Sequence, residues 1–257
     1  MTAGTSSETR PRWPNRALRW LYQPYKYLVF GPIFGVSTLF FASLAVFLCL
    51  FIKPRVVSAI TGVPWARLNA LITPMRVEVT GRGNVDPKQS YVVVSNHQSH
   101  YDVFVLYGFL GVDFRWIMKQ ELRKAPGIGI SCYRLGHIFI DRSNHSAALA
   151  SIETAKERIA SGTSVLFFPE GTRSRTGRLR PFKKGAFHFA RDLELPILPV
   201  TIVGTRDVLP SDSLDLKPGR ARLIIHPPIE LDGDSREEIA ALMDKVRGVI
   251  GGPLGEA

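Results

Sequence analysis

Residues 91–102 read YVVVSNHQSHYD, an apolar run followed at once by a polar corner. A near-continuous run of valines is typical of a strand that is buried on both faces of a sheet. Similar short runs recur, and together they predict strands at 77–80, 91–95, 114–118, 138–140, 164–168, 197–203 and 221–225. Apolar residues at helical spacing predict helices at 146–161, 185–193 and 235–250.

Strands and helices therefore alternate along most of the chain. This order indicates an α/β domain with a largely parallel or mixed sheet flanked by helices. We assign residues 73–257 to this domain, because a chain of 257 residues allows one domain and a shorter accessory segment. In such a fold the binding crevice opens at the carboxyl ends of the strands.

The composition excludes several classes of protein. Hydrophobic residues make up 45% and charged residues 21%, which is close to globular averages and unlike disordered, collagen-like or coiled-coil chains. The formal net charge of +11 favours an anionic partner, which could be nucleic acid, an acidic carrier protein or a phospholipid surface. Cys49 and Cys132 are too few for a disulfide framework or a cysteine zinc site. We expect neither a metal nor a redox cofactor.

The N-terminal part contains an uncharged run of 25 residues, 28–52. As a helix it would extend roughly 38 Å, which exceeds the ~30 Å hydrocarbon core of a bilayer. A cleaved signal peptide has an apolar region of roughly 7–15 residues, so we expect this segment to be retained. Gly31, Pro32 and Gly35 leave open whether it spans the membrane or enters and leaves on one side.

The flanks of this run also suit a membrane surface. Residues 1–27 are basic and aromatic, as in an interfacial segment with a cytoplasmic charge bias. Residues 56–72 are apolar but interrupted by Gly62, Pro64 and Arg67, which favours a helix lying in the interface over a second span. An ordinary surface helix of the domain is the alternative. We therefore predict a membrane-anchoring helical segment over 28–72.

His97 and Asp102 lie in the polar corner that follows the strand 91–95. Five helical residues rotate the chain by about 500°, so this pair cannot meet along one regular helix and needs a strand-to-helix corner. If Asp102 holds one imidazole nitrogen, the other is free to accept a proton, which makes His97 a candidate general base. The spacing alone leaves open that His97 and His100 are surface residues or zinc ligands.

A second motif, FPEGTRS at 168–174, also follows an apolar strand. Gly171 permits close backbone approach, Thr172 offers a hydroxyl and Arg173 offers a forked donor that matches phosphate. Residues 168–184 contain six basic residues and one acid, so we expect an ordered anion site here.

These motifs resemble those of the 1-acylglycerol-3-phosphate acyltransferases, within the wider glycerolipid acyltransferase family. The resemblance covers residues 77–203 and rests on five blocks: NHQSHYD (96–102), KQEL (119–122) with Pro126 and Gly129, GHIFIDR (136–142), FPEGTRS (168–174) and LPILPV (195–200).

The resemblance implies acyl transfer from an acyl thioester to the free hydroxyl of lysophosphatidic acid, which gives phosphatidic acid without an acyl-enzyme. It implies that His97 deprotonates the hydroxyl and that Asp102 orients His97. It further implies that Arg173, Arg142 and Lys119 hold the substrate phosphate, with Glu170, Gly171 and Thr172 in the acceptor pocket. From the residues alone, Arg142 could instead pair with Asp141 or Asp113, and Lys119 could be a solvated charge.

Several features follow from this assignment. The basic stretch 175–184 would dock acyl-CoA or acyl carrier protein, and the enzyme would work at the cell membrane with its catalytic domain on the cytoplasmic side. Glycerol-3-phosphate, a lysophospholipid or an amino-acid lipid are alternative acceptors. A non-catalytic module that binds anionic lipid is the alternative from another class. We do not expect nucleic-acid binding, because no recognised module is present and the charge lies beside an apolar anchor.

Overall fold

The computed structural model describes residues 16–141, 159, 163–231 and 236–256. Seven strands form one sheet in the order β1-β7-β6-β2-β5-β3-β4. Their bounds are β1 Met75–Thr80, β2 Val92–Ser95, β3 Phe114–Lys119, β4 Ile138–Ile140, β5 Ser164–Phe167, β6 Ile197–Val203 and β7 Gly219–Ile225. All neighbouring pairs are parallel except β6 with β7, so the sheet is mixed, as predicted. Each predicted strand is present with its ends within two residues.

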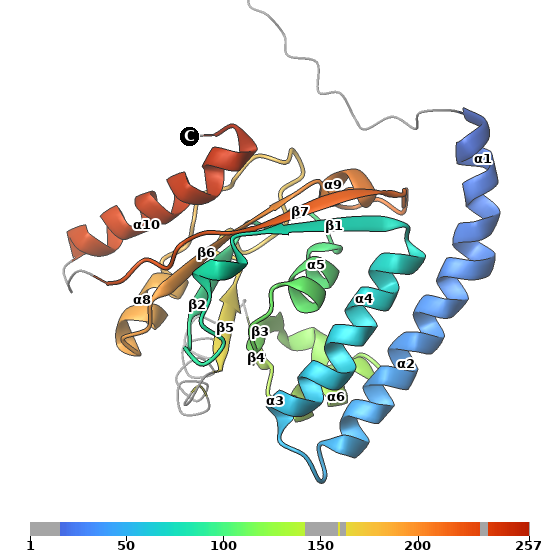
Figure 1. Cartoon of the computed structure of the whole chain (residues 1–257), viewed down its shortest axis with the longest axis horizontal. Helices are drawn as coiled ribbons and strands as arrows, with labels where there is room; N and C mark the ends of the chain where they lie inside the picture. The colour runs from blue at the N-terminus through green and yellow to red at the C-terminus, as the bar shows by residue number, and fades with distance from the viewer. Residues whose placement is uncertain (1–15, 142–158, 160–162, 232–235, 257) are drawn as a thin grey trace, which may run out of the picture.

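Helices cover both faces of this sheet (Figure 1). One face carries α4 Val63–Ile72 and α5 Asp102–Phe109, and the other carries α8 Gly185–Asp192 and α10 Arg236–Gly251. Shorter helices are α6 Ile128–Arg134 and α9 Thr205–Val208, and single turns are η3 Arg82–Asn84, η4 Gln120–Lys124 and η5 Gly252–Leu254. The predicted helices 185–193 and 235–250 are confirmed. The one predicted at 146–161 lies almost wholly outside the described residues.

Strand β2 shows why the sheet needs both layers. Val93 packs into the core under α4 and α5, whereas Val92 and Val94 pack into the core under α8 and α10. All three side chains are fully buried. Alternate residues of a strand point to opposite faces, so a run of valines is stable only where both faces are covered. The carboxyl end of β2 is thereby fixed at the centre of the sheet.

The N-terminal part is a continuous helix from Arg16 to Leu48, made of α1 Arg16–Tyr25, the π-helical turn η1 Lys26–Phe30 and α2 Gly31–Leu48. Pro32 has no N–H to give to residue 28, and the wider turn just before it accommodates this loss. Within this helix, Trp20–Leu48 has 29 residues, and an 18-residue stretch of it has a mean hydropathy of 1.9, enough in length and composition to cross a membrane.

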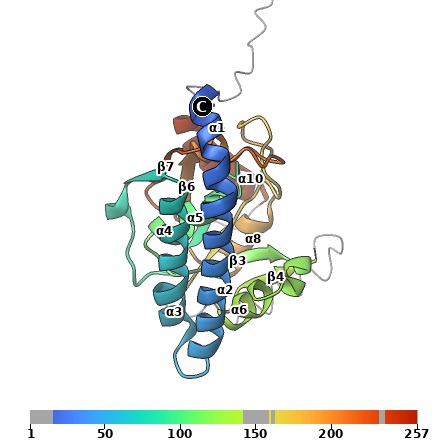
Figure 2. The same cartoon turned by 90° about the vertical axis from the view of Figure 1, so that its right-hand side faces the viewer.

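The chain then reverses and returns through α3 Pro54–Val57, the π-helical turn η2 Ser58–Gly62 and α4. Figure 2 shows α2 running between α4 on one side and α6 on the other. Ala66 and Ala70 of α4 are fully buried in the main core, so residues 63–72 form a helix of the domain. Of the two alternatives for 56–72, the structure supports the domain helix.

Candidate active site

The corner after β2 is fastened to the neighbouring strand by Asn96. Its side-chain amide donates to the Ile202 carbonyl at 2.8 Å, and its side-chain oxygen accepts from the Ile202 N–H at 2.7 Å. These two bonds replace the strand pairing that ends at Ser95. The chain can therefore turn out of the sheet at a fixed place, before α5 begins at Asp102.

The corner brings His97 and Asp102 together. The Nδ1 atom of His97 lies 2.7 Å from Oδ2 of Asp102, whose side chain is fully buried. The same oxygen accepts from the backbone N–H groups of Gln98 at 2.7 Å and Ser99 at 2.9 Å. The hydroxyl of Thr205 donates to the other oxygen, Oδ1, at 2.5 Å. With Nδ1 donating to this fixed carboxylate, the Nε2 atom of His97 is the one left to accept a proton.

The plane of the His97 ring is set by Phe168, which follows β5. The two rings stack with their centroids 3.8 Å apart and their planes 12° from parallel. The imidazole is thus held at its edge by Asp102 and on one face by an aromatic ring. The His97 side chain is 18% exposed to solvent, so a reactant can reach it.

Glu170 joins the corner to the basic loop 173–184. Its Oε1 accepts from the His97 N–H at 2.8 Å and its Oε2 accepts from the Arg180 N–H at 3.0 Å. The side chain is buried, and burial raises the pKa of this carboxyl. Both carboxylate oxygens accept hydrogen bonds from main-chain N–H groups, so Glu170 links the corner to the basic loop.

The remaining residues of the second motif lie on the same loop. Gly171 has a φ of +71°, a conformation that favours glycine, and a Cβ there would lie 2.9 Å from Nζ of Lys183. Thr172 is exposed. The Ser174 N–H donates to the His97 carbonyl at 2.7 Å, which holds this loop against the corner.

Arg173 is partly buried, and its Nη1 atom is sealed from solvent without a hydrogen-bond partner. Among the residues that the structure describes, it is the only buried side-chain nitrogen or oxygen in this state. Partial burial and the Arg173 charge also lower the pKa of His100, which places the guanidinium near the corner. A buried, unpaired charged donor is costly, and an anion would satisfy it.

Lys119 and Arg142 are the two other residues expected to bind the phosphate. Lys119 is exposed at the carboxyl end of β3, the neighbour of β5, and so lies on the edge of the sheet that carries His97 and Arg173. Arg142 lies outside the described residues. Asp113, an alternative partner for Arg142 in the sequence, pairs with Arg115 at 2.8 Å.

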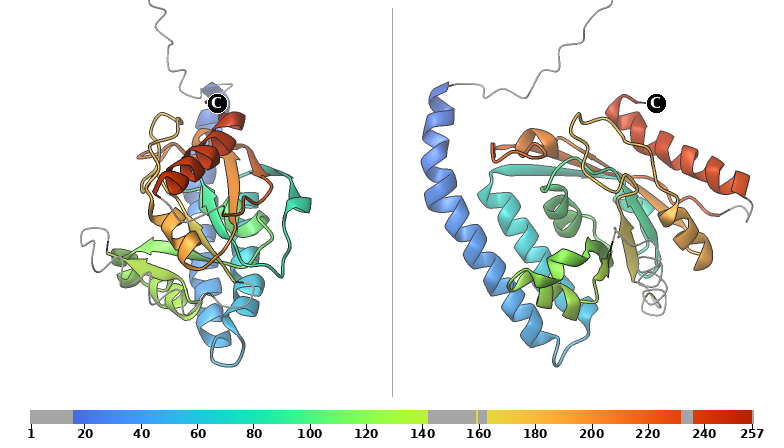
Figure 3. Two further views of the ribbon diagram at one scale, coloured as in Figure 1. Left: turned by 90° about the vertical axis from the view of Figure 1, so that its left-hand side faces the viewer. Right: turned by 180° about the vertical axis from the view of Figure 1, so that it is seen from behind.

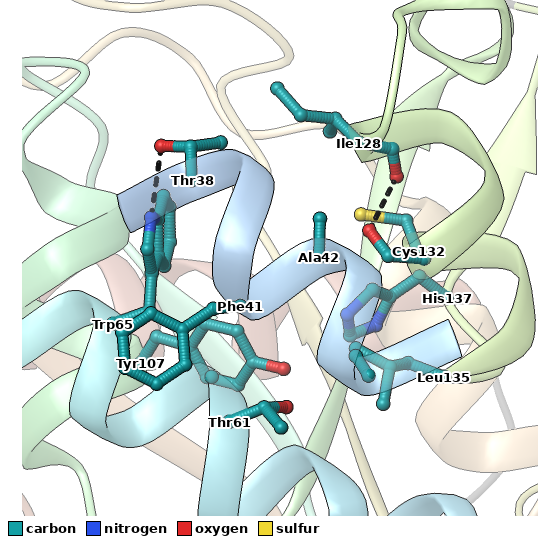
Figure 4. Close-up of a pocket in the computed structure, with 13 residues that line it drawn as sticks. Thr38, Phe41, Ala42, Thr61, Trp65, Tyr107, Ile128, Cys132, Leu135 and His137 are labelled. Atoms are coloured by element: carbon teal, nitrogen blue, oxygen red, sulfur yellow. Dashed lines mark hydrogen bonds between the residues drawn. The ribbon is translucent and has the colours of Figure 1, made fainter. Parts of the chain in front are cut away.

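An apolar cavity of about 100 Å³ lies between α2, α4, α5 and α6 (Figure 4). Its lining residues are Thr38, Phe41, Ala42, Ala45, Thr61, Gly62, Trp65, Tyr107, Ile128, Ser131, Cys132, Leu135 and His137. A chain of aromatic contacts connects it to the corner. Tyr107 in its wall lies 6.0 Å from Trp116, and Trp116 stacks at 6.1 Å on Phe168, the ring that covers His97.

Three features of this site were not predicted from the sequence. Thr205 follows the buried strand β6 directly, so the signal that identified His97 and Glu170 also applied to it. The cavity gave no such signal, because its walls come from segments far apart in the chain. Phe168 was within a quoted motif, but nothing in the sequence indicated that it stacks on His97.

Comparison with known proteins gives consistent matches. The family model described as Acyltransferase matches residues 76–203. The chain is 37% identical over 174 residues to the 1-acyl-sn-glycerol-3-phosphate acyltransferase alpha of Ovis aries, covering 67% of this chain and 61% of that protein. It is 36% identical over 191 residues to a chloroplastic 1-acyl-sn-glycerol-3-phosphate acyltransferase of Brassica napus, covering 71% of this chain and 55% of that one. The alignments thus span less than two thirds of these relatives.

A solved structure is similar over nearly its whole length. The crystal structure of the 1-acyl-sn-glycerophosphate acyltransferase from Thermotoga maritima superposes with a TM-score of 0.79. The two sequences are 29% identical, and the match covers 93% of this chain and 97% of the other. The shared part therefore includes the N-terminal helices as well as the sheet.

Proposed function

Because this chain belongs to the acyltransferase family, we propose that it acylates the free sn-2 hydroxyl of 1-acylglycerol-3-phosphate to give phosphatidic acid. One observation carries the proposal: His97, held at Nδ1 by a buried carboxylate, lies beside a loop with a buried and unpaired arginine nitrogen. The reaction requires a base next to an anion site, and both lie where the neighbouring parallel strands β2 and β5 end.

The proton path follows from the His97 geometry. Nε2 of His97 takes the proton of the sn-2 hydroxyl as its oxygen attacks the thioester carbonyl carbon. The tetrahedral intermediate then collapses, the C–S bond breaks, and the imidazolium returns the proton to the leaving thiolate. The Asp102 carboxylate stabilises the imidazolium between these steps. General-base assistance of this kind contributes about 10² to 10⁴ in rate.

Arg173 is the residue that we assign to the substrate phosphate, with Lys119 and Arg142 as further cations. A bidentate guanidinium–phosphate contact would satisfy the unpaired Nη1. Gripping the phosphate also localises the hydroxyl next to His97, and positioning of this kind lowers the entropic barrier to attack. Glu170, Gly171 and Thr172 shape the loop that presents Arg173.

The apolar cavity is where we place the acyl chain of the donor. It is of the order of the ~150 Å³ cavity that binds benzene in an engineered protein, so an apolar chain end suits it. Successive ring contacts, from Tyr107 in its wall through Trp116 and Phe168, connect it to His97. The exposed basic residues of 175–184 would bind the phosphates of acyl-CoA or the acidic surface of acyl carrier protein.

We also propose that the enzyme works at the cell membrane, with its catalytic domain on the cytoplasmic side. The long apolar helix supports membrane association, and the basic residues beside it support the cytoplasmic orientation. Both substrates of the reaction carry long acyl chains. A membrane surface would therefore supply the acceptor directly.

The test is a turnover assay of the purified full chain with lysophosphatidic acid and either acyl-CoA or acyl carrier protein as donor. His97→Ala is expected to reduce phosphatidic acid formation by about 10² to 10⁴. His188→Ala is the matched control, because His188 lies on α8 and takes no part in the hydrogen bonds of the corner. Undiminished turnover by His97→Ala rejects His97 as the base.

A panel of acceptors tests the substrate assignment. Arg173→Ala is expected to raise KM for lysophosphatidic acid at least tenfold, with a smaller rise for Arg173→Lys, which keeps the charge but loses the fork. Faster turnover of glycerol-3-phosphate, a lysophospholipid or an amino-acid lipid would reassign the acceptor. Lipid binding without turnover on any of them would favour the non-catalytic alternative.

A further inference from the structure

The imidazole of His137 lies in the wall of the apolar cavity. His137 immediately precedes β4 and is only 4% exposed. Figure 4 shows its ring beside Leu135, facing Ala42 across the cavity. The Nδ1 atom of the ring accepts a hydrogen bond from the Trp116 N–H at 3.3 Å.

The surroundings of the His137 ring determine its charge and which of its nitrogens carries the proton. Burial, and secondarily the nearby Arg115 charge, lower the pKa of His137 to about 3, so the ring is neutral at physiological pH. A neutral imidazole has one N–H and one acceptor nitrogen. Since Nδ1 accepts from Trp116, the proton is on Nε2. That N–H has no hydrogen-bond partner among the residues that the structure describes, and unlike Nη1 of Arg173 it is not sealed off but opens to the cavity.

The other polar side chains of the cavity wall are already satisfied. The Thr61 hydroxyl donates to the Val57 carbonyl at 2.7 Å, and the Ser131 hydroxyl donates to the Ile128 carbonyl at 3.0 Å. The Tyr107 hydroxyl lies 2.9 Å from that of Ser58. The Nε2–H of His137 therefore stands out as a donor that a ligand could use.

We propose that His137 is a hydrogen-bond donor to an oxygen atom carried on the acyl chain, so that the cavity prefers hydroxy- or oxo-acyl donors over plain hydrocarbon chains. This inference rests on the proposed function, since it needs the cavity to hold the acyl chain. The contact falls on the chain rather than on the thioester, because His137 contacts Trp116, and Trp116 reaches His97 only through the ring of Phe168.

The energetics favour such discrimination. An N–H enclosed by apolar side chains loses its hydrogen bond to water when a hydrocarbon chain fills the cavity, and that loss counts against the plain chain. A chain with an acceptor oxygen at the right carbon restores the bond. A neutral hydrogen bond of this kind corresponds to a preference of about three- to tenfold in kcat/KM.

The experiment is a position scan with the purified full chain and lysophosphatidic acid. Hexadecanoyl-CoA is compared with hexadecanoyl-CoA donors that carry one hydroxyl or oxo group at successive carbons. The wild-type protein is expected to prefer one or two adjacent positions over the plain chain by about three- to tenfold. Absence of acyl transfer from every donor refutes the proposed function itself. Transfer without preference for any oxygenated position overturns only the role of His137.

Two variants test whether His137 is the donor. His137→Leu removes the N–H and is expected to bring the ratio of kcat/KM for the preferred oxygenated donor and the plain donor to about one, whatever its effect on either value alone. His137→Gln keeps both an acceptor for the Trp116 N–H and a donor for the ligand, so it should retain part of the preference. Thr61→Val is the matched control, because the Thr61 hydroxyl is already bonded to Val57, and it should keep the preference. A preference that survives in His137→Leu overturns the proposal.

A measurement on the wild type guards against misfolding of the variants. In protein labelled with ¹⁵N-histidine, the Nε2 resonance of His137 should shift on addition of the preferred oxygenated acyl-CoA and not shift comparably with the plain one. Equal shifts with both donors contradict the proposed hydrogen bond, whether or not the variants fold.

Discussion

Thr205 shows how a single hydroxyl, placed after the strand next to β2, supports the candidate base. Its Oγ1 donates to Oδ1 of Asp102 at 2.5 Å, and both residues are fully buried. Thr205→Val keeps the shape but leaves a buried carboxylate oxygen without this donor, which costs about 1–3 kcal/mol. We expect kcat to fall about tenfold, because Asp102 orients His97 less firmly. Denaturant unfolding and steady-state kinetics measure the two effects.

Thr205→Ser separates the hydrogen bond from packing, since it keeps the hydroxyl and loses only a methyl group. It should retain most of the activity. Equal activity in the Val and Ser variants would mean that the Asp102 carboxylate needs no hydrogen bond from Thr205.

The buried ring of His137 should make the stability of the fold depend on pH. Its pKa is lowered to about 3 in the folded protein, whereas an unfolded imidazole titrates near ~6.5. As the pH falls below about 6.5, the unfolded chain takes up a proton at this ring and the folded chain does not, so the free energy of unfolding falls. The slope from one such ring approaches about 1.4 kcal/mol per pH unit.

Denaturant unfolding of wild type and His137→Leu between pH 7 and pH 4 measures this contribution. Lowered pKa values of His100 and His226 act in both proteins, so the difference between them isolates His137. The stability of the Leu variant should decline less steeply with acid. Parallel curves would mean that the ring is protonated in the fold.

At the level of elements, the packing of α6 against η4 depends on a glycine. A Cβ at Gly129 would lie 2.0 Å from the Arg123 carbonyl oxygen, a backbone atom that cannot move aside alone. Because α6 carries Ile128 and Cys132 of the cavity wall, Gly129→Ala should both destabilise the fold by about 1–3 kcal/mol and alter acyl-chain preference.

Gly248→Ala in α10 is the matched control for this prediction. Nothing lies within 4 Å of its added Cβ, and alanine in a helix interior is favoured by about 0.5–1 kcal/mol. It should raise the denaturation midpoint, whereas Gly129→Ala should lower it. A neutral Gly129→Ala would mean that η4 adjusts without strain.

Some elements could be predicted from sequence and others could not. The strands were found to within two residues because each is a short apolar run buried on both faces, as Val92–Val94 is. Helix α6 was not predicted, because its segment mixes glycine, serine and cysteine without a polar face. The Thr205–Asp102 contact joins residues 103 apart, and no local pattern encodes such a pairing.

Across the whole molecule, the candidate site and the apolar helix are parts of one structure. The views in Figures 1 and 3 place the helix α1–α2 along one side of the domain and α10 at the opposite side. The inward side of α2 contributes Ala42 and Ala45 to the cavity wall. The same helix therefore offers an outward apolar surface and an inward wall for the acyl chain.

The outward surface of α2 carries exposed apolar side chains that suit contact with lipid. Phe40 and Leu39 keep 58% and 55% of their exposure, an arrangement that costs free energy in water and is relieved in lipid. Phe40→Glu places a charge on this surface, so binding to phospholipid vesicles in a flotation assay should fall at least tenfold. Ala241→Glu, which adds the same charge on exposed α10, should bind as the wild type does. With a net charge of +11, binding should also be tighter to anionic vesicles and weaken with salt. If Phe40→Glu floats with vesicles as well as the wild type, the membrane contact lies on another face of the protein, and the assignment of the outward surface of α2 to lipid is wrong.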